Sequence, residues 1–250
     1  MKPDFQSDDG AVKLFLGDGN AVLPTLAGQI DHIVTDPPYS ERTHAGHYVA
    51  CNTPDTRNQL GYSFLTPLAC FETAEILCKV CPGWIVWMTD HVLAPAIANS
   101  LESAGRYVFA PLPYYAPGSR VRLTGDGPSS WTDWIIASRT AKQSRWGTLP
   151  GGYLKGQGQT WNDKAITGGK PSALMSLMAS DYSREEETIC DPFMGAGSTG
   201  LGCIRTGRKF IGIETDPSTF ELAKSRIQVE LSHGDFLRPK HEKPKQAALI

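Results

Sequence analysis

Short β-rich runs alternate with amphipathic segments along most of the chain. Each run gathers β-branched and aromatic residues, and turn-forming residues separate it from the next. The strands that this pattern predicts are Val12–Leu16, His32–Thr35, Trp84–Met88, Tyr107–Leu112, Trp134–Ser138, Thr188–Cys190 and Phe210–Ile213. Alternation of strands with helical segments is typical of an α/β domain around a largely parallel sheet.

Three helices are predicted where a proline stands in the first turn. The pairs 66–67, 170–171 and 216–217 each place a proline where its missing N–H costs nothing. Apolar residues recur three and four positions apart in the last two helices, which gives each one face for the sheet. These residues are Leu174, Leu177, Met178, Phe220, Ala223 and Ile227. By contrast, segment 113–169 is rich in Gly, Pro, Ser and Trp and holds one convincing strand, which is typical of functional loops.

The composition is that of a globular protein. The 250 residues include 24 Lys+Arg and 26 Asp+Glu, with 40% hydrophobic and 20% charged residues, which excludes collagens, disordered tails and histone-like polycations. No apolar run approaches the roughly 20 residues of a membrane span, and the N-terminus lacks a signal-peptide pattern. A cytoplasmic location is therefore expected.

The cysteines are expected to be reduced thiols. Cys78 and Cys81 form a C-x-x-C, but no second pair stands at zinc-finger spacing, so core packing is favoured over a metal site. His44, His47 and Cys51 lie in a polar loop, which a solvated or nucleic-acid-facing position explains at least as well as a metal. No metal is predicted.

A stiff loop of Asp36, Pro37, Pro38 and Tyr39 directly follows the strand 32–35. The carboxyl end of a strand is where α/β folds build their sites. The prolines have a fixed φ and no N–H, so the loop presents bare carbonyls beside one carboxylate and one aromatic ring. The carboxylate and the Pro37 carbonyl can each accept one N–H of an amino group while the ring stacks on a base. The alternative is a proline-stiffened turn with an N-capping aspartate.

A glycine-rich loop, 191–200, follows the strand 188–190 and opens a helix. Gly195 and Gly197 let the backbone approach a ligand closely, and the helix N-terminus favours negative charge. Glu214 ends the next strand about 20 residues on, where an acidic residue usually binds a ribose diol. A nucleoside-bearing cofactor is predicted in preference to a structural turn. No Walker lysine follows, which disfavours a P-loop.

Together the two loops resemble the signatures of the S-adenosylmethionine-dependent amino DNA methyltransferases. Asp-Pro-Pro-Tyr at 36–39 and Asp-Pro-Phe-Met-Gly-Ala-Gly-Ser-Thr at 191–199 stand in the order of the permuted β class, and the likeness extends from about Lys13 to Ile227. It implies an α/β, Rossmann-like methyltransferase fold with a circularly permuted motif order. The sheet would be mostly parallel and twisted, with about seven strands and helices on both faces.

The resemblance also implies roles for residues of both loops. Catalysis would fall to Asp36, Pro37, Pro38 and Tyr39. Glu214 would hold the ribose hydroxyls of S-adenosylmethionine, and Asp18 would lie near its adenine. The complete set implied to bind this cofactor is Asp18, Lys170, Pro171, Asp191, Pro192, Phe193, Gly195, Gly197, Ser198, Thr199 and Glu214. Ala196 and Ser198 stand where the family more often has Ser and Thr, both close in size.

The implied reaction is methyl transfer to the exocyclic amino nitrogen of a base. Hydrogen bonds to Asp36 and to the Pro37 carbonyl would favour a pyramidal nitrogen with a lone pair free to attack the sulfonium methyl group. Positioning of two substrates contributes up to about 7–11 kcal/mol in well-oriented cases. A base in a duplex must flip out to reach such a pocket, and Tyr39 would replace part of the lost stacking.

Positive charge is concentrated in segment 106–170. Nine Lys and Arg against three Asp give it +6, so the remainder carries −8. Interleaved aromatic residues (Trp131, Trp146, Tyr153 and Trp161) suit a surface that contacts phosphates and bases, and the alternative is a solvated loop above packed tryptophans. The polar loop 40–62 is a second candidate. The residues predicted to contact DNA are His44, His47, Arg120, Arg122 and Lys155.

Adenine N6 is the favoured target, and cytosine N4 is the alternative because both bases present the same amino geometry. Motif order disfavours an RNA or protein-glutamine methyltransferase. Intact Asp36 and cofactor glycines disfavour a DNA-binding protein without turnover. Asp-Pro-Phe before the glycines and the lack of a dehydrogenase catalytic set disfavour an NAD-dependent dehydrogenase.

The chain is interpreted as one methyltransferase domain, 1–237, with a mobile tail at 238–250. Its parts are a catalytic half (about 11–112), a recognition insert (about 113–169) and a cofactor half (about 170–232). The expected partner is double-stranded DNA, and no association with a membrane is expected. The resemblance implies a bacterial or phage-encoded enzyme. The resemblance also allows a homodimer and a separate restriction endonuclease.

Overall fold

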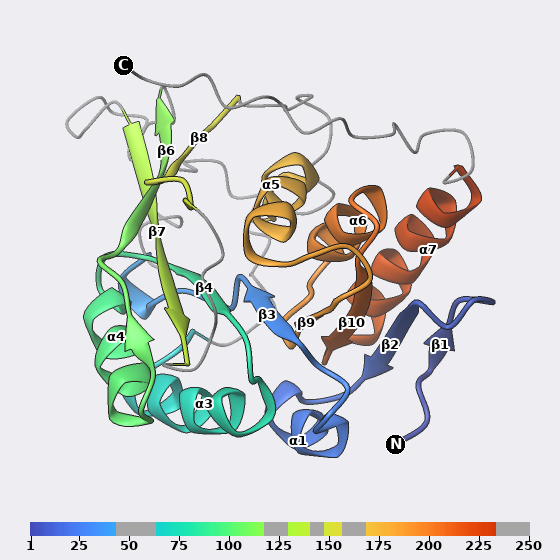
Figure 1. The fold of residues 1–250 in the computed structure, drawn as a ribbon, viewed down its shortest axis with the longest axis horizontal. Coiled ribbons are helices and arrows are strands. Elements are labelled where there is room, and N and C mark those ends of the chain that lie inside the picture. The colour runs from blue at the N-terminus through green and yellow to red at the C-terminus, as the bar shows by residue number, and fades with distance from the viewer. Residues whose placement is uncertain (44–63, 118–129, 141–147, 157–168, 234–250) are drawn as a thin grey trace, which may run out of the picture.

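The computed structural model describes residues 1–43, 64–117, 130–140, 148–156 and 169–233. Within them, one ten-stranded sheet carries helices on both faces (Figure 1). Its strands are β1 (Phe5–Gln6), β2 (Val12–Leu16), β3 (His32–Thr35), β4 (Ile85–Thr89), β5 (Tyr107–Val108), β6 (Leu112–Pro117), β7 (Ser130–Arg139), β8 (Tyr153–Leu154), β9 (Thr188–Asp191) and β10 (Lys209–Glu214). The helices are α1 (Gly19–Val22), the 3-10 helix η1 (Leu23–Leu26), α3 (Pro67–Val80), α4 (Ala94–Ser103), α5 (Ser172–Tyr182), α6 (Ser198–Arg205) and α7 (Pro217–His233). No helix in these ranges is long and apolar enough to cross a membrane.

The centre of the sheet is parallel. The strand order is β1-β2-β10-β9-β3-β4-β7-β6-β8, with β5 paired to β7. The strands β2, β10, β9, β3 and β4 run parallel to their neighbours in this series. By contrast, β1 is antiparallel to β2, and β7 is antiparallel to β4, β5 and β6. The Rossmann-like α/β class is confirmed; the permuted motif order stays a prediction.

The expected count of seven strands is too low. The predicted strand 107–112 divides into β5 and the start of β6, and segment 113–169 holds most of β6, all of β7 and β8 rather than one strand. The prediction missed β6 because Pro113 and Pro117 lie in it, and a proline in a sequence argues against a strand since it has no N–H to donate to the sheet. Both lie outside the pairing with β8, which involves only Tyr114 and Tyr115. The two-residue strands β1 and β8 are too short to show an alternation.

The three proline-marked helices are confirmed, with one shift and one wrong residue. α3 begins at Pro67 and α7 at Pro217, whereas α5 begins one residue later than predicted, so Pro171 is its N-cap. Leu177 is 39% exposed, and its predicted place on the packed face of α5 is wrong. The buried apolar residues of α5 are Leu174, Met175, Met178, Ala179 and Tyr182.

Two hydrophobic cores lie on the two faces of the sheet. Because successive side chains of a strand point to opposite faces, Ile85 and Trp87 enter one core while Val86 and Met88 enter the other. Helices α5, α6 and α7 cover the second of these faces, and α1, α3 and α4 cover the first (Figure 1).

The strands β3 and β9 are adjacent in the sheet, and the helices that follow them lie on opposite faces. The helix α3 follows β3 over one face toward β4, and α6 follows β9 over the other face toward β10. Open α/β sheets bind ligands beyond the carboxyl ends of such a strand pair. The loops 36–39 and 191–200 follow these two strands, so the sheet places them side by side.

Candidate active site at the carboxyl ends of β3 and β9

The loop 36–39 forms a polar cluster with residues distant in the sequence. The Tyr39 hydroxyl donates to Asp36 Oδ1 at 3.0 Å. Lys170, just before α5, has its Nζ 3.1 Å from Asp36 Oδ2 and donates to the Tyr39 hydroxyl at 2.7 Å. Asp133 of β7 completes the cluster, with Oδ2 3.4 Å from the same Nζ. One ammonium group is thus shared by two carboxylates.

The cluster carries a net charge of −1 when both carboxylates are ionised. Burial alone would lower the pKa of Lys170, but the charges of Asp133 and Asp36 raise it above its usual value, so the ammonium persists. Burial raises the pKa of Asp36, which Lys170 opposes and Asp133 reinforces. Burial and the two carboxylates raise the pKa of Tyr39 well above its usual value. Tyr39 therefore remains a neutral phenol.

The ring of Tyr39 lies against Lys170, whose Nζ is 4.6 Å from the ring centroid. A base could therefore stack only on the opposite face of this ring. Pro37 is buried and Pro38 is half-buried, which leaves the loop little freedom to adjust.

Asp90, directly after β4, anchors the chain that leaves the tetrapeptide. Its Oδ2 accepts from the Ser40 N–H at 2.9 Å, the Ser40 hydroxyl at 2.5 Å and the Thr43 hydroxyl at 2.6 Å. Burial alone would raise the pKa of Asp90, but these hydrogen bonds hold it below its usual value. Sequence reasoning missed Asp90, because an aspartate before a helix is an ordinary capping residue.

Asp191 links β3, the strand before the tetrapeptide 36–39, to the glycine loop. Its Oδ1 accepts from the Thr35 hydroxyl at 2.7 Å and from the Phe193 N–H at 3.1 Å. Its Oδ2 accepts from the Thr199 hydroxyl at 2.6 Å. Thr35 directly precedes Asp36 and Thr199 lies in the first turn of α6, so one buried carboxylate fastens the two loops together. Burial raises the pKa of Asp191 to about 6, although these hydrogen bonds oppose it.

We expect Asp191 to make the protein less stable as the pH rises from about 4 to about 6. The folded chain keeps this proton up to about pH 6 and the unfolded chain loses it near 3.8, so unfolding releases a proton in this window. The difference of about two pH units corresponds to about 3 kcal/mol of unfolding free energy. Urea denaturation at several pH values should show this loss in the wild type relative to Asp191→Asn, which cannot ionise. Equal pH slopes in the two proteins would contradict it.

The loop 191–200 enters α6 through two glycines in left-handed conformations. Gly195 has φ 51° and Gly197 has φ 80°, which glycine adopts readily. A Cβ on Gly197 would lie 3.2 Å from the Cβ of Ala223. Phe193, Gly195 and Ser198 are partly exposed along the loop. The buried residues among those predicted here are Asp191, Pro192, Gly197 and Thr199.

Glu214, at the end of β10, is held by backbone amides around the same loop. Its Oε2 accepts from the Gly195 N–H at 3.0 Å, and its Oε1 accepts from the N–H groups of Thr215 and Asp216, both at 2.9 Å. A carboxylate has about four acceptor sites. Glu214 therefore orders the glycine loop and keeps acceptor capacity for a ligand.

Asp18 lies at the same edge of the sheet, exposed at the start of α1. Its Oδ1 accepts from the Ala21 N–H at 2.9 Å. A Cβ on the neighbouring Gly19 would lie 2.6 Å from the carbonyl oxygen of Pro192, so α1 approaches the glycine loop closely. Of the residues predicted to bind the cofactor, Lys170 instead contacts Asp36 and Tyr39 of the tetrapeptide.

Most of the predicted DNA-contacting residues cannot be placed. His44, His47, Arg120 and Arg122 lie outside the described residues. Lys155 follows β8, is partly exposed, and its backbone N–H donates to the Tyr115 carbonyl at 2.8 Å.

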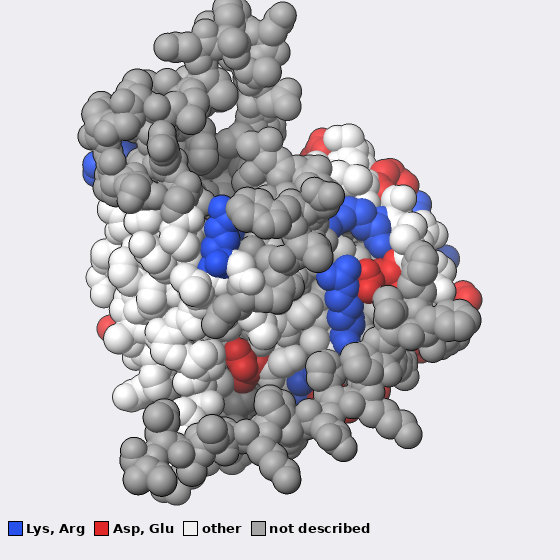
Figure 2. All heavy atoms as spheres, turned by 90° about the horizontal axis from the view of Figure 1, so that it is seen from above, with Lys and Arg blue, Asp and Glu red and all other residues white. Residues whose placement is uncertain are grey.

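The charge of segment 106–170 is partly internal. Arg106 is 6% exposed and donates to the Ser138 hydroxyl at 3.0 Å and to the carbonyl of Gly83. Tyr153, predicted for the DNA-facing surface, is buried and donates to Asp181 Oδ2 at 2.8 Å. Arg106 and Lys170 therefore contribute no surface charge, and the predicted exposure of Tyr153 is wrong. On the face in Figure 2, the basic side chains of the described residues form no single continuous patch.

Cys78, in the last turn of α3, and Cys81, directly after this helix, both pack in the hydrophobic core. Cys81 is buried, and its thiol donates to the Trp84 carbonyl at 3.3 Å. Burial raises its pKa to about 12. Cys78 is half-buried against the same core, and both placements support the core-packing interpretation. The described residues contain no group of His, Cys, Asp and Glu that could hold a metal ion.

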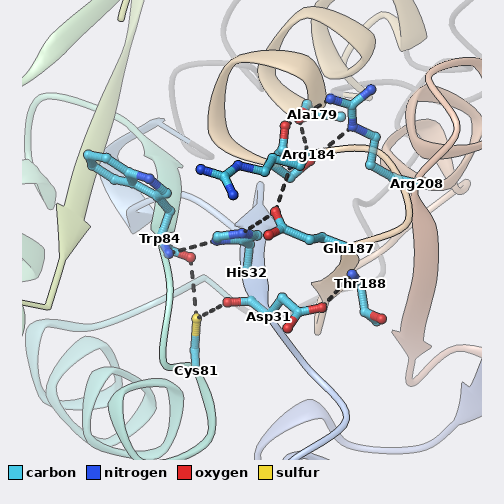
Figure 3. A network of polar contacts seen from close by, with 10 residues as sticks. Asp31, His32, Cys81, Trp84, Ala179, Arg184, Glu187, Thr188 and Arg208 are labelled. Carbon is cyan, nitrogen blue, oxygen red and sulfur yellow. Dashed lines mark hydrogen bonds and ion pairs between the residues drawn. The ribbon is translucent and has the colours of Figure 1, made fainter. Parts of the chain in front are cut away.

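A second polar network lies at the amino end of β3, the opposite end of this strand from the tetrapeptide (Figure 3). The Nδ1 of His32 accepts from the Trp84 N–H at 2.9 Å, so Nε2 carries the hydrogen and faces Glu187 Oε2 at 2.9 Å. Asp31 Oδ2 accepts from the Thr188 N–H at 2.8 Å. Burial lowers the pKa of His32 although Glu187 opposes it. The neutral imidazole thus joins β3 to the segments before β4 and β9, away from the tetrapeptide.

The sequence of the second half of the chain matches a known family. Residues 131–225 match the model of the N6/N4 DNA methylases, described as DNA methylase. The resemblance to the amino DNA methyltransferases is confirmed. The matched range includes Asp133, Lys170, the glycine loop and Glu214.

Two bacterial relatives of this family share part of the chain. The type II methyltransferase M2.LlaDCHI of Lactococcus lactis subsp. cremoris is 34% identical over 83 residues, which are 33% of this chain and 30% of the relative. The type II methyltransferase M2.DpnII of Streptococcus pneumoniae is 34% identical over 79 residues, 32% of this chain and 29% of the relative. The matched region thus spans less than a third of these relatives.

Solved structures of amino DNA methyltransferases share the fold over most of the chain. The M1.HpyAVI–SAM complex matches with a TM-score of 0.65 and 21% identity, over 86% of this chain and 98% of that one. The PvuII DNA methyltransferase, which is cytosine-N4-specific, matches with a TM-score of 0.64 and 14% identity, over 93% and 95%.

Proposed function

We propose that this protein transfers a methyl group from S-adenosylmethionine to an exocyclic amino nitrogen of a base in double-stranded DNA. The observation that carries the proposal is that the cluster around Asp36 and the glycine loop follow adjacent parallel strands and share the hydrogen bonds of Asp191. Ligands bound by these two loops would lie next to each other, as group transfer requires.

The residues of the glycine loop fit a nucleoside-bearing cofactor. Gly195 is partly exposed and has no side chain to cover the backbone, and Glu214 keeps acceptor capacity beside it. In the proposal Glu214 holds the ribose hydroxyls, and the exposed Asp18 lies near the adenine. S-adenosylmethionine, when bound, supplies the electrophilic methyl group.

The catalytic cluster suits an amino group that becomes positively charged. Asp36 and the Pro37 carbonyl accept the two amino hydrogens and hold the nitrogen toward the methyl donor. Fixed charges aimed at a developing charge are worth most in a buried site. The net charge of −1 shared by Asp36, Asp133 and Lys170 therefore favours the cationic amine over the neutral one.

We propose adenine N6 as the target, because the resemblance associates a tetrapeptide beginning with Asp36 more often with adenine. Cytosine N4 is the second candidate, favoured by the similarity to a cytosine-N4-specific structure. The division into a catalytic half, a recognition insert and a cofactor half remains part of the proposal, as do action in the cytoplasm, a homodimer and a restriction partner. The tail 238–250 lies outside the described residues.

The deciding experiment is incubation with unmethylated genomic DNA and S-adenosylmethionine, followed by single-molecule sequencing of the modified bases. We expect N6-methyladenine in one short sequence context. N4-methylcytosine would instead select the second candidate. Cofactor binding without any modified base would indicate a DNA-binding protein without turnover, and calorimetric binding of NAD alone would indicate a dehydrogenase.

Replacing Glu214 by glutamine is expected to weaken S-adenosylmethionine binding about 10- to 100-fold. The amide replaces one acceptor oxygen with an NH2 group that opposes a backbone N–H, and a hydrogen bond to a charged group contributes about 1.5–3 kcal/mol. Titration calorimetry measures the change. The control is Glu221→Gln, which removes an exposed carboxylate paired only with Lys224 among the ion pairs of the described residues. Equal affinities in both variants would refute this role of Glu214.

A further inference from the structure

We propose that Asp133 is a positioning residue for methyl transfer, holding Lys170 so that Asp36 keeps an oxygen available to the amino group of the base. The inference rests on the proposed function and adds a residue from outside both signature loops. Asp133 lies on β7, which is separated from β3 by β4 in the sheet.

The two oxygens of Asp133 have different neighbours. Oδ1 accepts from the indole N–H of Trp131 at 2.7 Å, and Oδ2 lies 3.4 Å from Lys170 Nζ. Only 4% of Asp133 is exposed, and its position on the strand is fixed by pairing with Tyr114 of β6. The carboxylate is therefore held in place with one oxygen directed at the ammonium group.

This arrangement determines how tightly Lys170 occupies Asp36. Without Asp133, the ammonium would have Asp36 as its one carboxylate partner in the cluster, and the 3.1 Å contact would close into a simple ion pair. With Asp133 present, Lys170 has a second carboxylate to bind when Asp36 turns to the substrate. A buried ammonium left without a partner would be strongly unfavourable. Asp133 therefore lets Lys170 give up its contact with Asp36 without becoming unpaired.

The titratable groups that face Asp36 support the same role. In the part of the chain that the structure describes they are Lys170, Asp133, Tyr39 and Asp191. Tyr39 remains neutral, Lys170 lowers the pKa of Asp36, and the negative charge of Asp133 raises it. Removal of that charge lowers the pKa of Asp36 and makes its carboxylate a weaker acceptor for the amino hydrogen.

The test is Asp133→Asn, with single-turnover methylation of DNA measured from pH 4.5 to 8 at saturating S-adenosylmethionine. We expect the rate to fall about 10- to 100-fold, less than for a group that touches the reacting atoms. The acidic limb of the pH profile should move to lower pH, and cofactor affinity should change less than twofold. Asp133→Glu keeps the charge and should return the limb toward its wild-type position.

The outcomes separate this inference from the proposed function. A wild-type rate in Asp133→Asn, or a slower rate with an unmoved acidic limb, would overturn the positioning role while the function stands. Wild-type protein that transfers no methyl group in the same assay would refute the function itself. Thermal melting checks that each variant folds, and Asp133→Ser removes the charge with a smaller side chain if Asp133→Asn does not fold.

Discussion

Replacing Asp36 by alanine is expected to reduce methyl transfer to DNA about 1000-fold while cofactor affinity changes less than twofold. The substitution removes the carboxylate that accepts the amino hydrogen, and loss of one such group at a reacting centre typically costs 10²- to 10³-fold in rate. Asp36 hydrogen-bonds to Tyr39 and pairs with Lys170, which keeps Asp133 as its ionic partner in the variant, so the fold and the cofactor site should persist.

Incorporation of a radiolabelled methyl group into DNA measures the rate, and calorimetry measures cofactor binding. Asp8→Ala, which changes an exposed aspartate near the N-terminus, is the control and should retain the wild-type rate. Near-normal turnover in Asp36→Ala would exclude the role given to Asp36. A parallel loss of cofactor affinity would indicate instead that the variant has disturbed the neighbouring loop.

Replacing Gly202 by alanine is expected to lower the free energy of unfolding by about 2 kcal/mol. A Cβ at this position of α6 would lie 2.7 Å from the carbonyl carbon of Met175 and from the backbone nitrogen of Ser176 in α5. Backbone atoms cannot rotate away, so the helices must separate, and overpacking of this kind costs about 1–3 kcal/mol or more. This exceeds the gain of about 1 kcal/mol from alanine's helix propensity.

Differential scanning calorimetry should show a melting temperature lower by roughly 4–8 °C. Gly151→Ala is the matched control, because a Cβ there meets no atom within 4 Å. If both variants melt with the wild type, the close contact between α5 and α6 does not contribute to stability in this way.

The sequence predicted the features that rest on local pattern. The strands 12–16 and 32–35 match the structure residue for residue, because alternation and buried runs are local. Each of the two signature loops directly follows a strand, as its position after a β-rich run implies. The helices α3 and α7 begin where a proline follows a capping residue.

The features that the sequence did not predict depend on contacts between distant residues. In the sequence, Asp133 is one acidic residue in a basic segment. No pattern in the neighbouring residues indicates that its carboxylate lies beside the ammonium group of Lys170. Arg106 was counted as surface charge, although its guanidinium satisfies carbonyls inside the protein. Charge counts assume exposure, which only the tertiary structure decides.

The shared carboxylate of Asp191 has a thermodynamic consequence. Thr35 and Thr199 reach it from the two sides of the site, so a ligand that orders one loop reduces the conformational entropy that the other loop must lose on binding. Such coupling is reciprocal. The affinity for DNA should therefore rise when the cofactor is bound, and the affinity for the cofactor should rise by the same factor when DNA is bound.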